Sequence, residues 1–298
     1  MAVTADTKVQ NASFWLDFKA ITKMGLSISV LFSAIAGYFL GAEIIDWTTV
    51  ILLTIGGYAM VGASNVFNQI IEKDYDALMN RTSNRPIPAG RVSVQQAFLL
   101  GCFLTVLGIT TLYIINPKSA MFGAISIFLY TSVYTPLKTK TPLSVFFGAI
   151  PGAIPFMLGW VAATNDFDIE PGTLFMLQFF WQFPHFWAIG WFLDDDYSKA
   201  GFKMLPTGKK DKGTAMQTIL YSVWTIIVSI IPVFGITGDL KLTIAGAILV
   251  FIAGLLMLYF AFQLFKKRTS KAARQLMLAS VTYITLIQII YVVDKFIR

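Results

Sequence analysis

Two polar segments, each following a long apolar stretch, carry the residues that can do chemistry. In the first, Asn68, Glu72 and Asp76 recur every fourth residue, so on a helix their side chains project from one face. By the predicted topology this face lies at the C-terminal end of its helix, where the helix dipole disfavours anions. The second segment begins with three consecutive acids at the same kind of helix end, namely Asp194, Asp195 and Asp196. Both segments therefore collect negative charge that needs a cation.

These acids predict a magnesium site. Hard oxygen ligands suit Mg²⁺, which is commonly shared between protein carboxylates and substrate phosphates, so a diphosphate is the expected substrate. The candidate Mg²⁺ ligands are Asn68, Glu72, Asp76, Asp194, Asp195 and Asp196. Neighbouring basic residues can bind the remaining diphosphate oxygens; they are Arg81, Arg85, Lys199 and Lys203. The alternative for the basic residues is the ordinary positive charge of cytoplasmic loops, with ion pairs inside each loop.

The two segments resemble each other when the first is shifted by 118 residues. Asp76 then pairs with Asp194, and two basic residues, Pro-x-Gly and another basic residue follow in the same order. Chance agreement between loops rich in Lys, Pro and Gly is the alternative. We interpret the pattern as two related four-helix halves followed by a ninth helix, with the two acidic corners facing each other across a central cavity.

The composition predicts that a membrane protein positions these residues. Of the 298 residues, 56% are hydrophobic and 13% are charged, whereas soluble domains carry nearly twice that charged fraction. About nine apolar stretches are long enough to cross ~30 Å of hydrocarbon as helices. They fall near residues 24–41, 47–67, 96–115, 119–136, 143–163, 172–192, 216–236, 241–264 and 276–293. The expected fold is all-α, a polytopic bundle of transmembrane helices.

Charge placement predicts the orientation of the chain. Most of the 23 Lys and Arg residues fall in loops on one side of the bundle, which places those loops and the N-terminus on the cytoplasmic side of the inner (cytoplasmic) membrane. This topology explains the net charge of +7 without nucleic acid as a partner. Residues 1–23 lack the layout of a signal peptide and are expected to be a cytoplasmic segment, and residues 24–298 a single transmembrane domain. The only cysteine, Cys102, excludes a disulfide or thiolate cluster within the chain.

Three further residues are candidates because of their depth or position. His185, the only histidine, lies ~13 Å along its helix from the acidic triplet, toward the bilayer centre, where a polar ring is costly unless paired or used. Tyr134 and Lys138 stand at the cytoplasmic mouth of the fourth span, where they either bind the substrate or anchor the helix. The aromatic side chains near His185 either shield a carbocation or simply pack; they are Phe179, Phe180, Trp181, Phe183, Phe186, Trp187 and Trp191.

With these residues in place, the chain resembles the UbiA family of intramembrane prenyltransferases. The first signature of that family, Asn-x3-Asp-x3-Asp followed by an Arg-rich loop, is matched by Asn68, Glu72 and Asp76 with Arg81 and Arg85. Glu72 departs from the pattern, since it stands where the family has an Asp, but its longer side chain still carries a carboxylate.

Within the family, the heme O synthase branch is similar over about residues 24–292. The segments that carry this similarity are Tyr134-Thr-Pro-Leu-Lys138, Gly148-Ala-Ile-Pro-Gly-Ala-Ile-Pro155, Trp181-Gln-Phe-Pro-His-Phe-Trp187 and Asp196-Tyr197-x2-Ala-Gly-x2-Met-Leu-Pro206. The second Asp-x3-Asp signature of quinone-type relatives is not intact, since Phe192 and Ala200 stand four residues on either side of Asp196.

The resemblance implies a UbiA-type fold and a Mg²⁺-dependent transfer of the farnesyl group of farnesyl diphosphate to a vinyl group of heme b, with water supplying a hydroxyl, to give heme O. It implies catalytic roles for Asn68, Glu72, Asp76, Asp196 and His185, with iron contact, proton transfer and a structural role all open for His185. Tyr134, Lys138 and the four basic loop residues can bind diphosphate or a heme propionate. Beyond the substrates and the lipid bilayer, a heme A synthase or terminal oxidase assembly proteins are candidate partners.

Two alternatives share part of this pattern. A prenyltransferase acting on a quinone precursor has the first acidic signature but gives no reason for the heme-type segments. A secondary transporter also combines internal repeats with a basic cytoplasmic face, but transporters place ionisable groups at mid-membrane, and here the acids gather at one surface.

Overall fold

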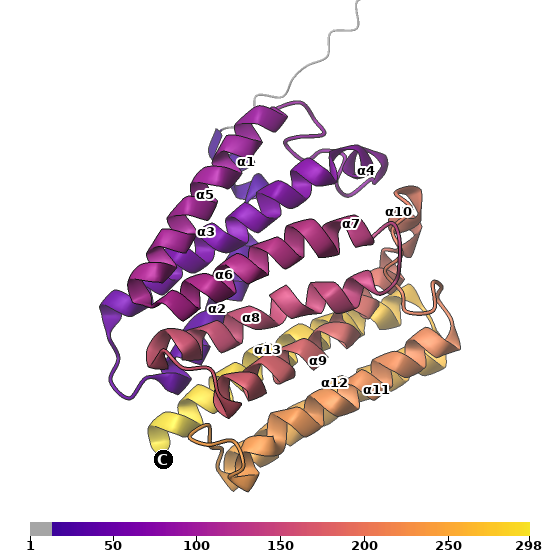
Figure 1. Cartoon of the computed structure of the whole chain (residues 1–298). Coiled ribbons are helices and arrows are strands. Elements are labelled where there is room, and N and C mark those ends of the chain that lie inside the picture. Colours follow the sequence, from indigo (N-terminus) through magenta and orange to yellow (C-terminus); the bar gives the residue numbers. More distant parts are fainter. Residues whose placement is uncertain (1–13) are drawn as a thin grey trace, which may run out of the picture.

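The computed structural model describes residues 14–298, and this part of the chain is entirely helical apart from its loops (Figure 1). The helices are α1 (Phe14–Ile21), α2 (Met24–Gly41), α3 (Trp47–Ile71), α4 (Lys73–Leu78), α5 (Val94–Ile115), α6 (Pro117–Phe128), α7 (Thr135–Leu137), α8 (Ser144–Thr164), α9 (Ile169–Phe192), α10 (Asp194–Lys199), α11 (Lys212–Ile230), α12 (Ile244–Lys267) and α13 (Ser270–Ile297). A π-helix, η1 (Leu129–Tyr134), joins α6 to α7, and a short 3-10 helix, η2 (Ile231–Phe234), follows α11. The predicted all-α class is confirmed.

The predicted membrane spans correspond to the long helices. Within the described residues, eight helical segments are long and apolar enough to cross a membrane, counting α6 through α7 as one. The remaining predicted span, 172–192, is α9, which has 24 residues but is less apolar because it carries Gln178, Gln182 and His185. α9 lies among the other long helices, where these polar side chains are shielded from lipid.

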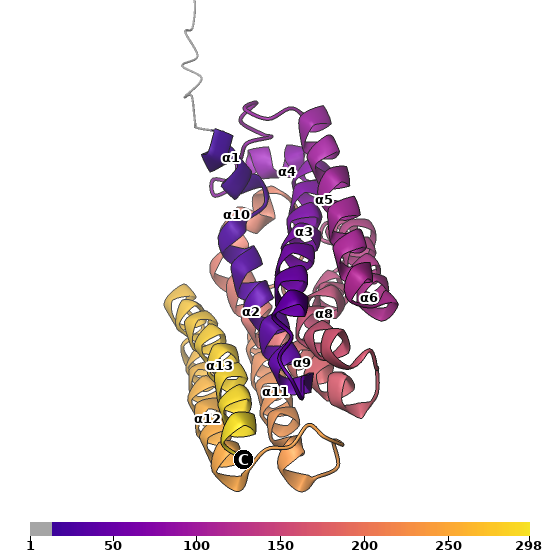
Figure 2. The same cartoon turned by 90° about the vertical axis from the view of Figure 1, so that its left-hand side faces the viewer.

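The long helices run side by side, and the short helices α4 and α10 lie together at one end of the bundle (Figures 1 and 2). α2 packs against α8, α8 against α9, and α9 against both α11 and α13, while α13 returns to contact α2. The α2–α8 contact is close because both helices present glycine. A Cβ at Gly37 would overlap the Phe156 carbonyl, and one at Gly159 would overlap the Ala34 carbonyl. Small residues commonly allow such close approach between membrane helices.

The internal repeat is visible in the loops but slips at the acidic corners. Gly90 and Gly208, 118 residues apart, have left-handed backbones with φ of 72° and 77°, and the helices that follow, α5 and α11, begin with the same spacing. The preceding long helices, however, end at Glu72 and Leu193, which are 121 residues apart. Three residues correspond to about 300° around a helix, so the acids of the two corners point in different directions.

The N-terminal segment is described only from residue 14, so most of the predicted cytoplasmic segment, residues 1–13, lies outside the described residues. α1 is attached to the bundle by Asp17, which forms an ion pair of 2.9 Å with Arg91. The Gln69 amide also donates to the Ile21 carbonyl at 2.8 Å. These contacts hold the chain close to the start of α2.

Candidate active site

A cavity of about 690 Å³ extends from the end of the bundle that holds α4 and α10 into its interior. Helices α2, α3, α6, α8, α9 and α13 contribute to its wall. Eight of the polar and charged residues predicted from the sequence line it, namely Asn68, Glu72, Asp76, Arg81, Arg85, Tyr134, Lys138 and His185. The other polar and charged residues predicted do not line this cavity; they are Asp194, Asp195, Asp196, Lys199 and Lys203.

The first acidic segment forms a buried ladder at the polar end of the cavity. Asn68 lies in the last turn of α3, Glu72 is the residue at which α3 ends, and Asp76 lies in α4. Because α4 follows α3 directly, the four-residue spacing keeps the three side chains on the cavity side. Their exposed fractions are 1%, 4% and 0%. Two carboxylates removed from water in this way require nearby cations.

Two cations from distant segments pair with the ladder. Arg85 Nη1 lies 2.6 Å from Asp76 Oδ2, and Lys138 Nζ lies 2.7 Å from Glu72 Oε1. Burial raises the pKa of Asp76 above its usual value, and the Arg85 guanidinium offsets only part of this effect. Burial acts to lower the pKa of Lys138, but the Glu72 carboxylate outweighs it, so that this pKa is raised. Each carboxylate is thus matched to one cation.

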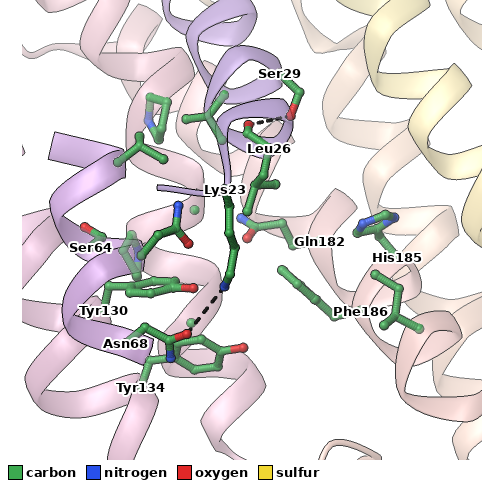
Figure 3. A pocket seen from close by; sticks show the side chains of 18 of the residues that line it. Lys23, Leu26, Ser29, Ser64, Asn68, Tyr130, Tyr134, Gln182, His185 and Phe186 are labelled. Atoms are coloured by element: carbon green, nitrogen blue, oxygen red, sulfur yellow. Dashed lines mark hydrogen bonds between the residues drawn. The ribbon is translucent and has the colours of Figure 1, made fainter. Parts of the chain in front are cut away.

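Lys23 adds a further cation at this end; from the sequence alone it was one of the many basic residues expected on the cytoplasmic side. It is the residue directly before α2, and its Nζ lies 3.4 Å from Asn68 Oδ1 (Figure 3). Burial, together with the Arg85 and Lys138 cations, lowers the pKa of Lys23 to about 7. Crowded cations of this kind favour binding of an anion with several oxygens, such as a diphosphate.

The π-helix η1 forms the adjacent wall of the cavity, and Thr135, which directly follows η1, orients Asn68. Tyr130 and Tyr134 of η1 line the cavity, and Lys138 Nζ lies 4.5 Å from the centre of the Tyr134 ring. Thr135 Oγ1 donates to the Tyr130 carbonyl at 2.8 Å and accepts from Asn68 Nδ2 at 3.1 Å. A carbonyl can only accept, so the single hydroxyl proton goes to Tyr130. The Asn68 amide therefore turns its nitrogen to Thr135 and its oxygen toward Lys23.

His185 lies across the open space from this wall. Figure 3 shows His185 and Phe186 of α9 opposite Asn68, Tyr130 and Tyr134. The His185 ring stacks on Trp181, with 4.8 Å between ring centres and 17° between planes, and its Nδ1 lies 2.9 Å from Ser280 Oγ of α13. His185 is therefore paired, as expected for a polar ring at this depth, and it also lines the cavity.

The second acidic segment has a different environment. Asp196 accepts hydrogen bonds from the backbone N–H groups of Asn80 at 2.8 Å and Arg81 at 3.2 Å. Partial burial acts to raise the pKa of Asp196, but these backbone donors, with the Lys199 ammonium at 3.3 Å, outweigh it and lower that pKa below its usual value. Asp196 thus fixes the loop that carries Arg81 to the mouth of the cavity.

The other charged residues of this segment lie at the surface. Lys210 Nζ lies 3.4 Å from Asp194 Oδ2 and 2.9 Å from Asp195 Oδ1. The Asp195 side chain is 93% exposed. Lys203 donates through its backbone N–H to the Lys138 carbonyl at 2.7 Å and thereby connects the second loop to the cavity wall.

Comparison with known proteins identifies the family of this bundle. Residues 30–286 match the UbiA prenyltransferase family. The chain belongs to the UbiA prenyltransferase family. It is 69% identical over 296 residues, 99% of each chain, to the protoheme IX farnesyltransferase of Christiangramia forsetii. It is 65% identical over 289 residues, 96% of each chain, to the protoheme IX farnesyltransferase of Flavobacterium psychrophilum.

Solved structures confirm the UbiA fold. A digeranylgeranylglyceryl phosphate synthase structure superposes with a TM-score of 0.78 at 18% identity, covering 94% of this chain and 98% of the other. A UbiA homologue from Archaeoglobus fulgidus, bound to DMAPP and Mg²⁺, superposes with a TM-score of 0.74 at 16% identity, covering 94% of this chain and 98% of the other.

The cavity residues of this UbiA member fit a magnesium ion. Asp76 Oδ1 is buried and has no hydrogen-bond partner among the described residues, so it is free to bind a cation. Asn68 Oδ1 and the Glu72 carboxylate lie on the same face, and together they form the all-oxygen donor set that Mg²⁺ prefers. No preformed group of three or more His, Cys, Asp or Glu side chains with metal-site geometry exists in residues 14–298. A substrate's phosphate oxygens and water would therefore have to complete the coordination.

Sequence reasoning missed several polar residues that line the cavity of this UbiA protein. Besides Lys23 and Tyr130, these are Gln178, Gln182 and Gln288, which lie deep in the bundle. The available signal was amide side chains inside apolar spans, which are costly in lipid unless they face a cavity or a partner. Among the aromatic residues, Trp181 and Phe186 line the cavity, whereas Phe183 and Trp187 pack in a separate cluster with Met204.

Proposed function

We propose that this chain transfers the farnesyl group of farnesyl diphosphate to a vinyl group of heme b, giving heme O and diphosphate. The observation that carries the proposal is the 69% identity over 99% of the chain to a protoheme IX farnesyltransferase. The cavity supports it, because a polar end rich in cations and carboxylates continues into an interior lined mainly by apolar side chains, with Gln178, Gln182 and Gln288 among them. Such a shape suits a prenyl diphosphate and a porphyrin, both largely apolar with anionic ends.

The bonds change as follows. The bond between C1 of farnesyl and the diphosphate oxygen breaks, diphosphate leaves, and C1 joins the terminal carbon of the vinyl group. The other vinyl carbon then takes a hydroxyl from water, and a proton is released. Arg85, Lys138 and Lys23 surround the place where negative charge accumulates on the leaving group, so they stabilise the departure of diphosphate.

Magnesium belongs to the same end. Asn68, Glu72 and Asp76 would hold Mg²⁺, which when bound supplies charge neutralisation for the leaving diphosphate. Asp194 and Asp195 remain candidate ligands predicted from the sequence, although neither lines the cavity. Asp196 acts through the Asn80–Arg81 backbone, and Arg81 binds an outer diphosphate oxygen or a heme propionate.

The cavity walls control the allylic cation. Tyr130, Tyr134 and Phe186 present ring faces and edges to the open space (Figure 3), and aromatic faces stabilise cations. The surrounding apolar side chains keep bulk water away, so that only a water admitted with the substrates reaches the vinyl carbon.

The orientation follows from charge. We place the N-terminus, α4 and α10 on the cytoplasmic side of the inner membrane, because the loops at that end carry most of the Lys and Arg residues. Farnesyl diphosphate then enters from the cytoplasm, and heme b from the bilayer. The product is handed to proteins that use heme O, with a heme A synthase or terminal oxidase assembly proteins as the candidate partners.

An assay with membranes from cells that express the chain tests the function. Heme b, farnesyl diphosphate and Mg²⁺ are added, and heme O is measured by mass. We expect metal-dependent formation of heme O, and no product when Glu72→Ala is supplied at equal abundance. If heme b stays unmodified while a quinone precursor is prenylated under the same conditions, the chain is a quinone-type prenyltransferase and the proposal is wrong.

A further inference from the structure

The imidazole of His185 is held in one orientation by contacts on two sides. Its face stacks on Trp181, with ring centres 4.8 Å apart. Trp181 is itself fixed to α13, because its Nε1–H donates to the Ser280 carbonyl at 2.6 Å. On the edge of the imidazole, Nδ1 lies 2.9 Å from the Ser280 hydroxyl. The rings of His185 and Trp181 are thus both anchored to Ser280 of α13.

The hydrogen bonds of Ser280 decide which nitrogen of His185 carries the proton. Ser280 Oγ donates its one proton to the Met277 carbonyl at 2.7 Å. Towards His185 the hydroxyl can then offer only a lone pair. Nδ1 must therefore be the protonated nitrogen of a neutral imidazole, and Nε2 keeps an unshared lone pair.

This arrangement is typical of a metal-binding histidine. Nε2 makes no hydrogen bond to any residue of the part of the chain that the structure describes, and His185 lines the cavity. Histidine ligands in metal sites commonly donate the N–H of the non-ligating nitrogen to an oxygen, which fixes the ring and makes the ligating nitrogen more basic. Iron porphyrins accept such a neutral imidazole as their axial ligand.

We propose that His185 binds the iron of heme b through Nε2, and that Ser280 is the positioning residue that selects the required tautomer. This inference rests on the function proposed above, in which heme b enters the cavity. It assigns the substrate iron, and not the vinyl group or a proton, as the partner of His185.

The position of His185 agrees with the direction in which the porphyrin must lie. Leu193, where α9 ends, lines the same cavity as Arg81, at the polar end. His185 precedes it by eight residues, so it lies about 12 Å deeper along the helix axis. With the iron bound at that depth, one edge of the porphyrin would extend toward the diphosphate site at the polar end of the cavity. His185 lines the same cavity as Asn68 and Tyr134, which lie opposite it (Figure 3).

The test uses the full-length protein in lipid nanodiscs, without farnesyl diphosphate. The probes are heme b and metal-free protoporphyrin IX, which differ only in the iron. We expect heme b to bind about tenfold more tightly or better, and ferrous heme b to show the iron–histidine stretching band in resonance Raman spectra. In His185→Gln this band and the preference for heme b should both disappear, while metal-free protoporphyrin IX still binds, which shows that the variant is folded.

Two further variants test the geometry. In His185→Gly, added imidazole should restore the axial-ligand spectrum. Ser280→Ala should keep heme b bound but shift the iron–histidine band to lower frequency, because Nδ1–H loses an acceptor, and Ser280→Thr should restore it. Equal binding of both porphyrins, or a band that persists in His185→Gln, overturns the assignment of iron to His185. An unshifted band in Ser280→Ala overturns the role of Ser280.

These outcomes are separate from those of the farnesylation assay. If heme b binds through His185 but is never farnesylated, the proposed function fails and the iron site stands. If heme O forms while the iron–histidine band is missing from the wild-type protein, the function stands and the iron site fails.

Discussion

The two acidic corners have similar sequences but different environments. At the first corner, Glu72 and Asp76 are buried in the cavity wall and paired with Lys138 and Arg85. At the second, the Asp195 side chain is 93% exposed. Acidic composition at a helix end is therefore a weak guide to a site, because the direction of the side chains, which is set by where the helix ends, decides whether they reach the cavity.

The three-residue slip between the repeats gives this difference a physical cause. With the helix breaks superposed, Glu72 corresponds to Leu193, and Asp76 to Tyr197. The second half therefore presents an apolar and an aromatic side chain to the cavity where the first half presents carboxylates; both line it. We infer that the first corner holds the metal and that Asp196 of the second corner supports the loop of the first.

The largest effect is expected from Glu72→Gln. This change removes a buried carboxylate of the ladder and leaves Lys138 without its 2.7 Å partner. We expect kcat/KM for farnesyl diphosphate to fall by about 10²–10³-fold, the range observed when one preorganised electrostatic contact is lost. Steady-state kinetics at saturating Mg²⁺ measure it.

Glu72→Asp is the matched control, since it restores the residue usual in the UbiA signature with a shorter reach. It should retain activity within about tenfold of the parent chain, given that only the geometry changes. A Glu72→Gln variant as active as Glu72→Asp would show that the charge at this position is not used.

A smaller effect is expected from Thr135→Val, which tests the orientation of Asn68. The substitution removes the acceptor for Asn68 Nδ2, while the Tyr130 carbonyl keeps its bond from the backbone N–H of residue 135. The amide can then rotate, so we expect the Mg²⁺ concentration for half-maximal activity to rise by about three- to tenfold, with kcat at saturating metal little changed. Metal titrations and Mn²⁺ binding followed by electron paramagnetic resonance measure it.

Thr135→Ser keeps the hydroxyl and should behave like the parent chain in both measurements. A loss of kcat in Thr135→Val without any change in the metal requirement would contradict the positioning role and indicate a general packing defect.

The sequence predicted the first corner well because its geometry is local. The i, i+4, i+8 spacing of Asn68, Glu72 and Asp76 determines their common face on a helix, and the structure shows that face lining the cavity. The long helices were also predictable, since each needs only a run of apolar residues of sufficient length.

What could not be predicted depends on contacts between distant segments. The sequence placed Lys138 at the mouth of the fourth span, but its pairing with Glu72 joins residues far apart in the chain and does not follow from local spacing. The role of Lys23 depends in the same way on the position of Asn68. For the Asp triplet, alignment of the loops pairs Asp76 with Asp194, whereas superposition of the helix ends pairs Asp76 with Tyr197. The helix ends are known only from the structure.

A still smaller effect, at the second corner, is expected from Asp196→Asn. The neutral amide is a weaker acceptor for the Asn80 and Arg81 N–H groups, so the loop that carries Arg81 loosens. We expect KM for farnesyl diphosphate to rise about three- to fivefold with kcat nearly unchanged. Because the pKa of Asp196 is lowered in the folded protein, the ionised carboxylate stabilises the fold near neutral pH. This stabilisation is lost as the pH falls through the lowered pKa.

Lys199→Met, which removes only the exposed partner of Asp196, is the control and should leave KM within twofold. If Asp196→Asn instead loses as much kcat as Glu72→Gln and raises the Mg²⁺ requirement, Asp196 is a direct metal ligand, as its acidic position in the sequence suggested. The two corners would then act as equals in the bound state.

The smallest effect is expected from Asp195→Ala, the substitution that separates the roles of the two corners most clearly. Within residues 14–298, the one ion pair of Asp195 is with Lys210 at 2.9 Å, and exposed ion pairs of this kind contribute about 0–1 kcal/mol to stability. Activity, Mg²⁺ requirement and thermal stability should therefore stay within about twofold or a few degrees of the parent chain, as measured by the heme O assay and by a thermal-shift experiment. A strong loss in Asp195→Ala would mean that α10 turns toward the cavity when metal and diphosphate bind, because only rotation of that short helix could bring an exposed carboxylate to the substrate. A null result would locate the metal chemistry at the first corner and leave the second corner as its support.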